Sequence, residues 1–299
     1  MKTKVGVIGA GNIGFGICRN LLRAGFDLVV CDVRTQPLEA LREQDATIAP
    51  TPGTVGRDCQ VVFSVVFDYA QNLAILKDSD GLLETMAPGG CIFVCSTIST
   101  THARRLADLA AQHDVRLMDC PVSGGKEGAM AGTLSLMIGG DVGPIAEHRA
   151  VLEAISANIY HLGDVGSGAA AKAVNQLLVA VHEVAAAEAL LLAAKGGLDL
   201  KQMIDIVGTS MGQSRIFDIR SVRMVKRDFT PRGVLKILLK DISIVLETGQ
   251  SQGLVLPLAN AAHQVFQAGV NKGLEDEDDA AVVKVLEALA SFSLDDVEN

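Results

Sequence analysis

The 299-residue sequence contains no tryptophan, and all aromatic residues together make up only 4% of the chain. This scarcity argues against a surface that stacks nucleobases on aromatic rings. Basic residues are also fewer than acidic ones, with 26 Lys and Arg against 35 Asp and Glu and a net charge of −9. We therefore expect no nucleic-acid partner and no attraction to an anionic membrane surface.

Cysteine pairs of the kind that hold metals are also absent. None of the six cysteines forms a Cys-x-x-Cys pair, and no His, Asp or Glu residues have the spacing of metal ligands. We therefore predict no metal site and no disulfide framework. The expected role of all six is that of small buried hydrophobic residues in a reducing cytoplasm. They are Cys18, Cys31, Cys59, Cys91, Cys95 and Cys120.

Long uninterrupted hydrophobic runs are scarce as well. The apolar run at residues 5–8 is too short for the core of a signal peptide. A longer apolar stretch, residues 177–194, is interrupted by His182, Glu183 and Glu188. We expect a soluble, cytoplasmic protein with no membrane partner.

What the sequence does contain is alternating strand and helix patterns in its first half. The strand-like runs are almost continuously apolar, as in strands buried on both faces, and helix-like segments separate them. This alternation predicts right-handed βαβ units in a mostly parallel, doubly wound sheet. The expected strands are residues 5–8, 28–31, 61–65, 91–94 and 115–118, with two more near 134–138 and 159–161, and helices include 13–24, 38–43 and 101–113.

The second half, from about Gly166, is rich in Ala and Leu with helical periodicity. A helix of about 28 residues is expected to end at Gly196-Gly197. Its alanine-rich faces suggest packing between subunits in a homodimer or homotetramer. Further helices are expected at residues 200–207, 231–252, 257–269 and 280–291, and the acidic run 275–279 is expected to be a solvated helix entry.

The predicted fold is therefore α/β followed by all-α. An N-terminal Rossmann domain with a doubly wound parallel sheet would span residues 1–164. An all-helical C-terminal domain for substrate binding and oligomerisation, opened by the long interdomain helix, would span residues 165–299.

A glycine-rich loop follows the first expected strand and opens the first helix, with the sequence Gly9-Ala10-Gly11-Asn12-Ile13-Gly14. In this context Gly9 permits a tight turn, Gly11 the approach of a pyrophosphate and Gly14 close helix packing. The helix N-terminus offers free amides to the phosphates. A methyltransferase with a similar loop is disfavoured by the all-helical second half, and a glycine turn without a ligand is the remaining alternative.

Asp32 ends the second expected strand, about 20 residues further on, where a carboxylate accepts hydrogen bonds from the adenosine ribose. This position favours NAD over NADP, because a 2′-phosphate would meet a like charge. Arg34 weakens the distinction, since an arginine nearby can accommodate that phosphate.

The start of the long helix carries a lysine among small apolar residues. Lys172 and Gln176 are four positions apart and share a helical face, with Asn175 beside them. Desolvation would lower the pKa of Lys172 and allow it to exchange protons near neutral pH. A lysine that extends along the helix to reach water is the alternative.

Five sequence blocks together resemble the β-hydroxyacid dehydrogenases, the group that includes 3-hydroxyisobutyrate, tartronate semialdehyde and 6-phosphogluconate dehydrogenases. They span the chain in order. Within this family, Gln176, His182 and the segment 210–214 are most similar to the branch that acts on L-threonate or D-erythronate. The blocks are Gly9-x-Gly11-x-x-Gly14, Ser96-Thr97, Asp119-Cys-Pro121-Val-Ser123-Gly124-Gly125, Gly166-x-Gly168-x-x-x-Lys172 and Lys240-Asp241.

The resemblance implies a role for each matched residue. Lys172 would be the general acid/base, and Ser123 with Gly124 and Gly125 would hold the substrate carboxylate. Thr97 would lie between nicotinamide and substrate, and Lys240 would approach both. The resemblance adds Asn175, Gln176 and Ser210 as substrate-binding residues, and Gly9, Gly11, Asn12, Ile13, Gly14, Asp32, Val33 and Val66 as cofactor-binding residues.

One departure from the family concerns the substrate. Many members carry Asn where this chain has Gln176, whose amide is one methylene longer. A pocket of changed size makes 3-hydroxyisobutyrate less suitable and favours a polyhydroxylated chain. A 6-phosphogluconate enzyme is disfavoured by the absence of an evident basic cluster in the second half, where Arg215, Arg220 and Arg223 are expected to form surface ion pairs.

The sequence thus predicts NAD-dependent oxidation of a small hydroxy acid, of the four-carbon L-threonate or D-erythronate type. The first alternative is an NADPH-dependent reductase of the same family, acting on glyoxylate, succinic semialdehyde or tartronate semialdehyde. The second is a dinucleotide-binding module without catalysis, although such a module would be expected to lose Lys172 or the Ser123 block. Imine reductases are related, but they usually lack the lysine.

Overall fold

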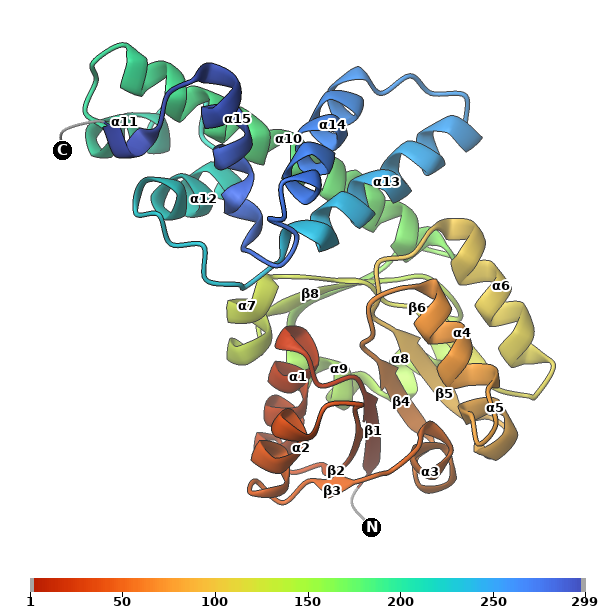
Figure 1. Cartoon of the computed structure of the whole chain (residues 1–299). Coiled ribbons are helices and arrows are strands. Elements are labelled where there is room, and N and C mark those ends of the chain that lie inside the picture. The colour runs from red at the N-terminus through yellow and green to blue at the C-terminus, as the bar shows by residue number, and fades with distance from the viewer. Residues whose placement is uncertain (1–2, 297–299) are drawn as a thin grey trace. The chain divides into compact units, whose positions relative to one another are not determined.

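The computed structural model of the protein describes residues 3–296 (Figure 1). Its contacts divide the chain into two compact units that meet in sequence between Lys172 and Ala173.

The first unit is built on a six-stranded sheet whose strands are all parallel, in the order β3-β2-β1-β4-β5-β6 (Figure 1). This is the doubly wound order, in which successive strands are added outward from β1 to β3 on one side and from β4 to β6 on the other. In such sheets ligands bind outside the carboxyl ends of the strands, at the point where the strand order reverses. The strands are β1 (Lys4–Ile8), β2 (Asp27–Cys31), β3 (Thr47–Ile48), β4 (Val61–Ser64), β5 (Cys91–Val94) and β6 (Arg116–Asp119).

Helices cover both faces of this sheet. Because side chains alternate along a strand, Val5 and Val7 join one hydrophobic cluster, which includes α1, whereas Ile8 joins a second cluster, which includes α6. Burial on both faces explains the continuous apolarity of the strands. The helices are α1 (Asn12–Arg23), α2 (Thr35–Arg42), α3 (Pro52–Asp58), α4 (Tyr69–Lys77), α5 (Leu82–Thr85) and α6 (Thr100–Ala111).

A second, three-stranded sheet completes the first unit. In it β7 (Val122–Ser123) pairs antiparallel and β9 (Ser156–His161) parallel with β8 (Leu134–Ile138). The helices α7 (Gly125–Ala131), α8 (Val142–Glu147) and α9 (Arg149–Ile155) accompany it. Helix α1 packs against α7 and α9, which joins this layer to the Rossmann core.

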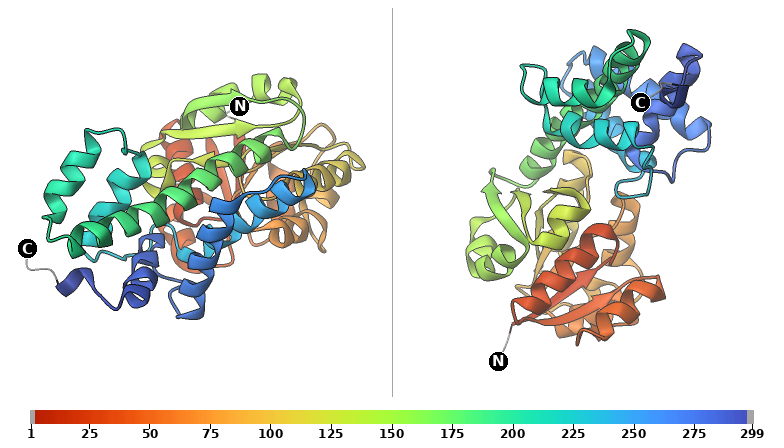
Figure 2. Two further views of the ribbon diagram at one scale, coloured as in Figure 1. Left: turned by 90° about the horizontal axis from the view of Figure 1, so that it is seen from above. Right: turned by 90° about the vertical axis from the view of Figure 1, so that its left-hand side faces the viewer.

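The long predicted helix is present as α10 (Ser167–Lys195), which Figure 2 shows in green as one uninterrupted helix. By length and composition alone α10 could cross a membrane, and 50% of its most apolar window is buried inside the protein. The core helix of a soluble protein meets the same criteria. After α10 the described chain is helical: α11 (Leu200–Gly208), α12 (Arg215–Val225), α13 (Leu235–Ser251), α14 (Pro257–Asn271), η1 (Asp279–Val282), α15 (Val283–Ala290) and η2 (Leu294–Asp296).

Two expectations for the second unit are wrong. The acidic run is not solvated throughout, because Asp278 and Asp279 are buried. The ion pairs predicted for Arg220 and Arg223 exist, but they are largely buried and join these arginines to Asp279 and Asp278. Buried charges persist only when they are paired, and the partners lie more than fifty positions apart in the sequence, beyond the reach of a local pattern.

Candidate functional site

The glycine loop between β1 and α1 is fixed by backbone contacts that only glycine allows. Gly9 has a φ of +95°, and a Cβ on it would lie 2.4 Å from the Val65 carbonyl oxygen. A Cβ on Gly14 would lie 1.9 Å from the Gly9 carbonyl oxygen. These two glycines therefore bring the start of α1 against the ends of β1 and β4.

Gly11 differs from Gly9 and Gly14 because no backbone atom lies close to the position that a Cβ on it would take. The nearest atom to a Cβ on Gly11 would be Nη2 of Arg34, at 3.5 Å. Gly11 is the N-cap of α1, and no side chain caps the helix there. The first-turn amides, beginning at Asn12, and the open Gly11 backbone fit the pyrophosphate of a dinucleotide. Ile13 is half-buried in the same turn.

Asp32 lies just after β2, beside this loop. Its carboxylate accepts hydrogen bonds from the amide of Ala10 at 2.6 Å and from the amide of Arg34 at 2.8 Å. The guanidinium of Arg34 donates to both carboxylate oxygens at 3.1 Å. Burial raises the pKa of Asp32, but these hydrogen bonds outweigh it and the pKa is lowered, so Asp32 is a carboxylate at neutral pH. Val33, which lies between Asp32 and Arg34 in the sequence, is fully exposed.

A buried polar network joins the loops after β4 and β5. The side-chain nitrogen of Asn72 donates to Oγ of Ser96 at 2.9 Å, and the side-chain oxygen of Asn72 accepts from Oγ of Ser64 at 2.7 Å. Ser96 in turn donates to the Val66 carbonyl at 2.6 Å. This network thus holds two predicted positions: Val66 takes part through its carbonyl, and Thr97 directly follows Ser96. Asn72 was not among the predicted residues, although a polar amide within an apolar helical segment is a signal that the sequence offers.

Lys172 and the Ser123 block come together within the first unit. The Lys172 side chain is buried, with 8% of its surface exposed, and its Nζ donates to the Val122 carbonyl at 2.8 Å. Val122 directly precedes Ser123, Gly124 and Gly125, and the two glycines have φ of 139° and 65°. These positive φ values explain why glycine follows Ser123 and turn the chain into α7. The structure therefore places the lysine nitrogen against the strand that carries the predicted anion-binding turn.

Asp119, at the end of β6, holds the start of α10. Its two carboxylate oxygens accept from the amides of Gly166 and Ala169, each at 2.7 Å. A Cβ on Gly168 would lie 2.2 Å from the Met137 carbonyl oxygen and 2.9 Å from Asp119 Oδ2. The Gly-x-Gly spacing before Lys172 thus permits a close approach of helix to strand. Asp119 lies within a matched block, but no role was predicted for it.

In the second unit a different polar cluster contains three of the predicted residues. Gln176 donates through Nε2 to Asp241 Oδ2 at 2.7 Å and accepts from Asn175 Nδ2 at 2.8 Å. Lys240 forms an ion pair with Asp241 Oδ1 at 2.8 Å. Ser210 lies outside this cluster, is exposed, and donates to the Ile206 carbonyl at 2.6 Å. Gln176 thus uses both ends of its amide within the protein.

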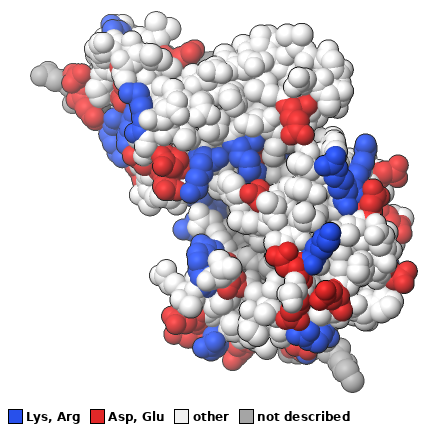
Figure 3. Space-filling view, turned by 45° about the vertical axis from the view of Figure 1, so that its right-hand side comes forward, with Lys and Arg blue, Asp and Glu red and all other residues white. Residues whose placement is uncertain are grey.

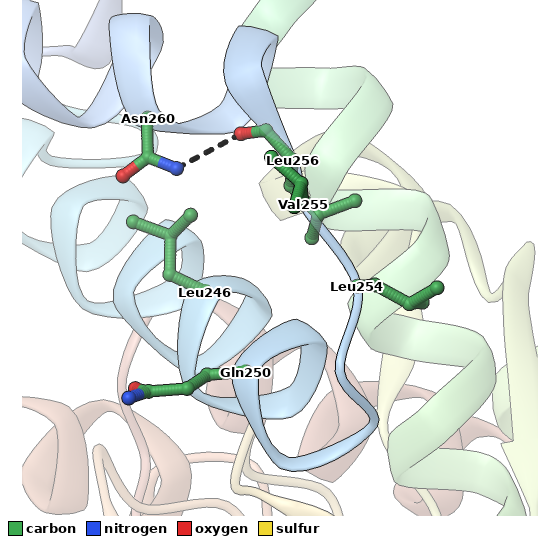
Figure 4. A pocket seen from close by; sticks show the side chains of 6 residues that line it. All are labelled: Leu246, Gln250, Leu254, Val255, Leu256 and Asn260. Atoms are coloured by element: carbon green, nitrogen blue, oxygen red, sulfur yellow. Dashed lines mark hydrogen bonds between the residues drawn. The ribbon is translucent and has the colours of Figure 1, made fainter.

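A pocket between α13 and α14 contains none of the predicted residues. Figure 4 shows its lining, in which Asn260 donates to the Leu256 carbonyl at 3.0 Å. None of its six lining residues is titratable: they are Leu246, Gln250, Leu254, Val255, Leu256 and Asn260. Within residues 3–296, no group of three His, Cys, Asp or Glu residues could hold a metal ion.

Comparison with known proteins finds similarity over nearly the whole chain. Residues 4–163 match the family model for the NAD binding domain of 6-phosphogluconate dehydrogenase. Residues 166–286 match the model for the NAD-binding of NADP-dependent 3-hydroxyisobutyrate dehydrogenase. The L-threonate dehydrogenase of Cupriavidus necator is 35% identical over 286 residues, which cover 95% of this chain and 96% of that protein.

The chain belongs to the 3-hydroxyisobutyrate dehydrogenase-like family. The crystal structure of 3-hydroxyisobutyrate dehydrogenase from Salmonella typhimurium has a TM-score of 0.89 and 34% identity, covering 95% of this chain and 100% of that one. The structure described as Psf3 in complex with NADP+ and 2-OPP has a TM-score of 0.87 and 26% identity, covering 94% and 99%.

Membership of this family confirms several predictions. The Rossmann domain followed by a helical region, the family and its L-threonate branch are as the sequence predicted. The protein is a hydroxyacid dehydrogenase that uses a nicotinamide dinucleotide. All six cysteines are buried, with free thiols, which confirms their predicted burial.

Proposed function

We propose that the protein oxidises a four-carbon sugar acid of the L-threonate or D-erythronate type, with NAD+ as hydride acceptor and Lys172 as general base. The observation that carries this proposal is the buried Lys172, whose nitrogen lies 2.8 Å from the Val122 carbonyl, one residue before Ser123. The names of the L-threonate dehydrogenases that are similar over most of the chain support the substrate class.

The bound nicotinamide would supply the chemistry of hydride acceptance. Oxidation of an alcohol also releases the hydroxyl proton, and a neutral amine within hydrogen-bond reach can accept it. The carbonyl of Val122 fixes the position of Nζ, and the burial of Lys172 keeps bulk water away from the proton. Running the reaction in reverse, the same nitrogen would donate the proton to a keto acid.

The Ser123 turn suits a carboxylate. Ser123 would offer a hydroxyl donor, and Gly124 and Gly125, both with positive φ, would offer backbone amides of the kind that bind anions in turns. These donors do not titrate near neutral pH, so they would hold a carboxylate without competing with Lys172 for the transferred proton.

The choice of NAD+ rests on Asp32. Its carboxylate is ionised and lies beside the glycine loop, where it would accept the ribose hydroxyls and repel a 2′-phosphate. A second candidate, an NADPH-dependent semialdehyde reductase of the same family, is favoured by Arg34, whose guanidinium lies at that carboxylate. Oxidation and reduction assayed with both dinucleotides separate the two candidates.

For the second unit, substrate binding by the predicted residues remains a prediction. The cluster of Asn175, Gln176, Asp241 and Lys240 offers amide and ammonium donors suited to hydroxyl and carboxylate groups. Ser210 offers a hydroxyl from the segment after α11. Removing each side chain singly and measuring KM for the best substrate tests these assignments.

The experiment on substrate class is a panel of threonate, erythronate, glycerate, 3-hydroxyisobutyrate and tartrate, with NAD+ and NADP+ at alkaline pH. We expect the highest kcat/KM with a four-carbon sugar acid and NAD+. A preference for 3-hydroxyisobutyrate, or turnover only as an NADPH-dependent reductase, would contradict the proposal.

The mechanistic experiment removes the proposed base. Lys172→Ala should lower kcat by about 10²- to 10⁴-fold, the usual contribution of general acid–base catalysis, with little change in dinucleotide affinity. Lys195→Ala is the matched control, because Lys195 lies on the same helix and also donates to a backbone carbonyl, that of Ala290. Unchanged turnover in Lys172→Ala would remove Lys172 from the mechanism.

A further inference from the structure

Asp119 makes an unusual set of contacts for a helix-capping aspartate. Asp68 and Asp199, which cap α4 and α11, act locally: Asp68 accepts from Gln71 and Asp199 from Gln202, each three positions away. Asp119 instead accepts from Gly166 and Ala169, which are 47 and 50 positions away, and its side chain is 1% exposed. Asp119 is therefore a tertiary connection between a strand end and the start of a distant helix.

The backbone around Asp119 is shaped to bring its carboxylate close to other segments. Its own carbonyl accepts from the amide of Gly139 at 2.8 Å, and a Cβ on Gly139 would lie 2.5 Å from Asp119 Oδ1. On the other side, a Cβ on Gly168 would lie 2.9 Å from Oδ2. Side chains larger than hydrogen are thus excluded on both sides of the carboxylate. Burial raises the pKa of Asp119, and the backbone amides oppose that rise.

This connection links two segments that carry the proposed chemistry. Asp119 is four positions before Ser123 in the sequence, so it fixes the chain that leads to the anion-binding turn. Ala169 is three positions before Lys172, less than one turn of α10. The Lys172 hydrogen bond to Val122 is a second link between these segments. A small rotation of the first turn of α10 would therefore move Nζ relative to the turn.

We propose that Asp119 is a positioning residue, which holds the first turn of α10 so that Lys172 stays in register with the Ser123 turn. This inference rests on the proposed function, because it assigns Asp119 an effect exerted through Lys172. Asp119 itself exchanges no proton with the substrate. It sets where the lysine nitrogen lies, and a displacement of about 1 Å at a reacting group can cost about 100-fold in rate.

The test is a double-mutant cycle between Asp119→Asn and Lys172→Ala. The asparagine side chain has nearly the same shape, but it turns an NH2 group toward one of the two backbone amides and so loses one of the two hydrogen bonds. We expect Asp119→Asn to lower kcat by about 10- to 100-fold in the wild-type background. Dinucleotide affinity, measured by fluorescence titration, should stay within about twofold, since the glycine loop is untouched.

The decisive comparison is made in the Lys172→Ala background. There Asp119→Asn should change kcat by no more than about twofold, because the group that Asp119 positions is already gone. Equal losses in both backgrounds, or no loss in the wild type, would overturn the inference. If Lys172→Ala itself keeps full turnover, the proposed function fails instead, so the two failures are distinguishable.

Two further variants guard against loss of folding. Asp141→Asn is the matched control, because Asp141 caps α8 in the same unit through the amide of Gly143 at 3.0 Å. It should leave kcat unchanged. If Asp119→Asn does not fold, Asp119→Ser keeps one acceptor in a smaller side chain and enters the same cycle. A coupling with Lys172→Ala supports the inference, and strict additivity overturns it.

Discussion

Asp32 and Arg34 bind each other at the edge of the glycine loop through the groups that a cofactor would use. In the structure the guanidinium of Arg34 occupies both oxygens of the Asp32 carboxylate, which are also the atoms that ribose hydroxyls would use. The carboxylate keeps its hydrogen bond from Ala10 in either case, because that amide approaches from the loop. A cofactor with free ribose hydroxyls therefore competes with Arg34 for Asp32, whereas a 2′-phosphate would favour Arg34 and oppose Asp32.

This arrangement predicts opposite effects for the two side chains on cofactor preference. Asp32→Ser should raise the ratio of kcat/KM with NADP+ to kcat/KM with NAD+ by about tenfold or more, because the repulsive charge is gone. Arg34→Ala should lower the same ratio by a similar factor, because no cation is left for the phosphate. Initial rates with both dinucleotides at fixed substrate measure the ratio.

Arg42→Ala serves as the control for charge alone. Arg42 lies in the last turn of α2 in the same unit and is exposed, so its removal changes the net charge without altering the Asp32 site. The ratio should stay unchanged in this variant. If Arg34→Ala behaves like Arg42→Ala, Arg34 takes no part in cofactor discrimination.

At the scale of elements, the start of α10 is defined by close packing. Gly168→Ala should destabilise the fold by about 1–3 kcal/mol, because its Cβ would overlap the Met137 carbonyl and the first turn must shift. Gly128→Ala in α7 is the matched control. Its Cβ would meet only Leu134 Cδ2 at 3.6 Å and Thr133 Oγ1 at 3.8 Å, and alanine favours the helix by about 0.5–1 kcal/mol. Urea unfolding of both variants gives the comparison, and equal stabilities would refute this account of the Gly-x-Gly spacing.

The elements that the sequence predicted well are those with a strong local pattern. The expected strands at residues 91–94 and 134–138 coincide with β5 and β8, and the 29-residue α10 begins and ends as expected. Helix α12 was not predicted, because charged residues interrupt its apolar pattern; the partners that neutralise its Arg220 and Arg223 lie far away in sequence. The start of α13 was placed four residues early, at 231 instead of Leu235.

The candidate site shows the same division between local and distant information. The glycine loop and Asp32 follow from residues that are adjacent in the pattern of strand, turn and helix. The network around Asn72 and the contacts of Asp119 depend on backbone groups brought together by the fold. Such contacts have no local sequence pattern, so the sequence could mark Asp119 only as part of a matched block.

At the scale of the whole molecule, the net charge of −9 is the difference between many acidic and many basic side chains. Figure 3 shows basic and acidic side chains interspersed on the face it presents. The anionic cofactor and substrate must therefore be bound by local donors, such as the α1 N-terminus and the Ser123 turn, because the overall charge opposes them.

The same excess of acid reaches the interior of the second unit. Glu183 is fully buried near Asp278 and Asp279, with Arg220 and Arg223 as the basic partners. Three carboxyl groups facing two arginines are neutral as a set only when one carboxyl group keeps a proton. Burial and then the neighbouring acids raise the pKa of Glu183 well above 4.5, and burial raises that of Asp279 from 3.8 to about 6, although Arg220 opposes both shifts.

These raised pKa values set the direction of the pH dependence. Above pH 4.5 an unfolded chain ionises Glu183, whereas the folded chain still holds the proton. The folded state then binds more protons, so this group's contribution to stability is full below pH 4.5 and is lost as pH rises. Asp32 and Asp80 have lowered pKa values and act in the opposite sense, with stability lost in acid. The folded protein should therefore be most stable in the pH interval between the loss in acid, which comes from Asp32 and Asp80, and the loss at higher pH, which comes from Glu183.

Replacing the buried acid isolates its share of this behaviour. Glu183→Gln mimics the protonated side chain, so its free energy of unfolding relative to wild type should rise steadily as pH increases from 4.5 toward neutrality. Glu188→Gln is the control, because Glu188 is exposed on the same helix, and its difference from wild type should stay nearly constant. Urea unfolding of the three proteins across this pH range measures both trends. A Glu183→Gln difference that is flat with pH, or that falls, would mean that the folded protein holds Glu183 ionised and that the cluster carries its full negative charge.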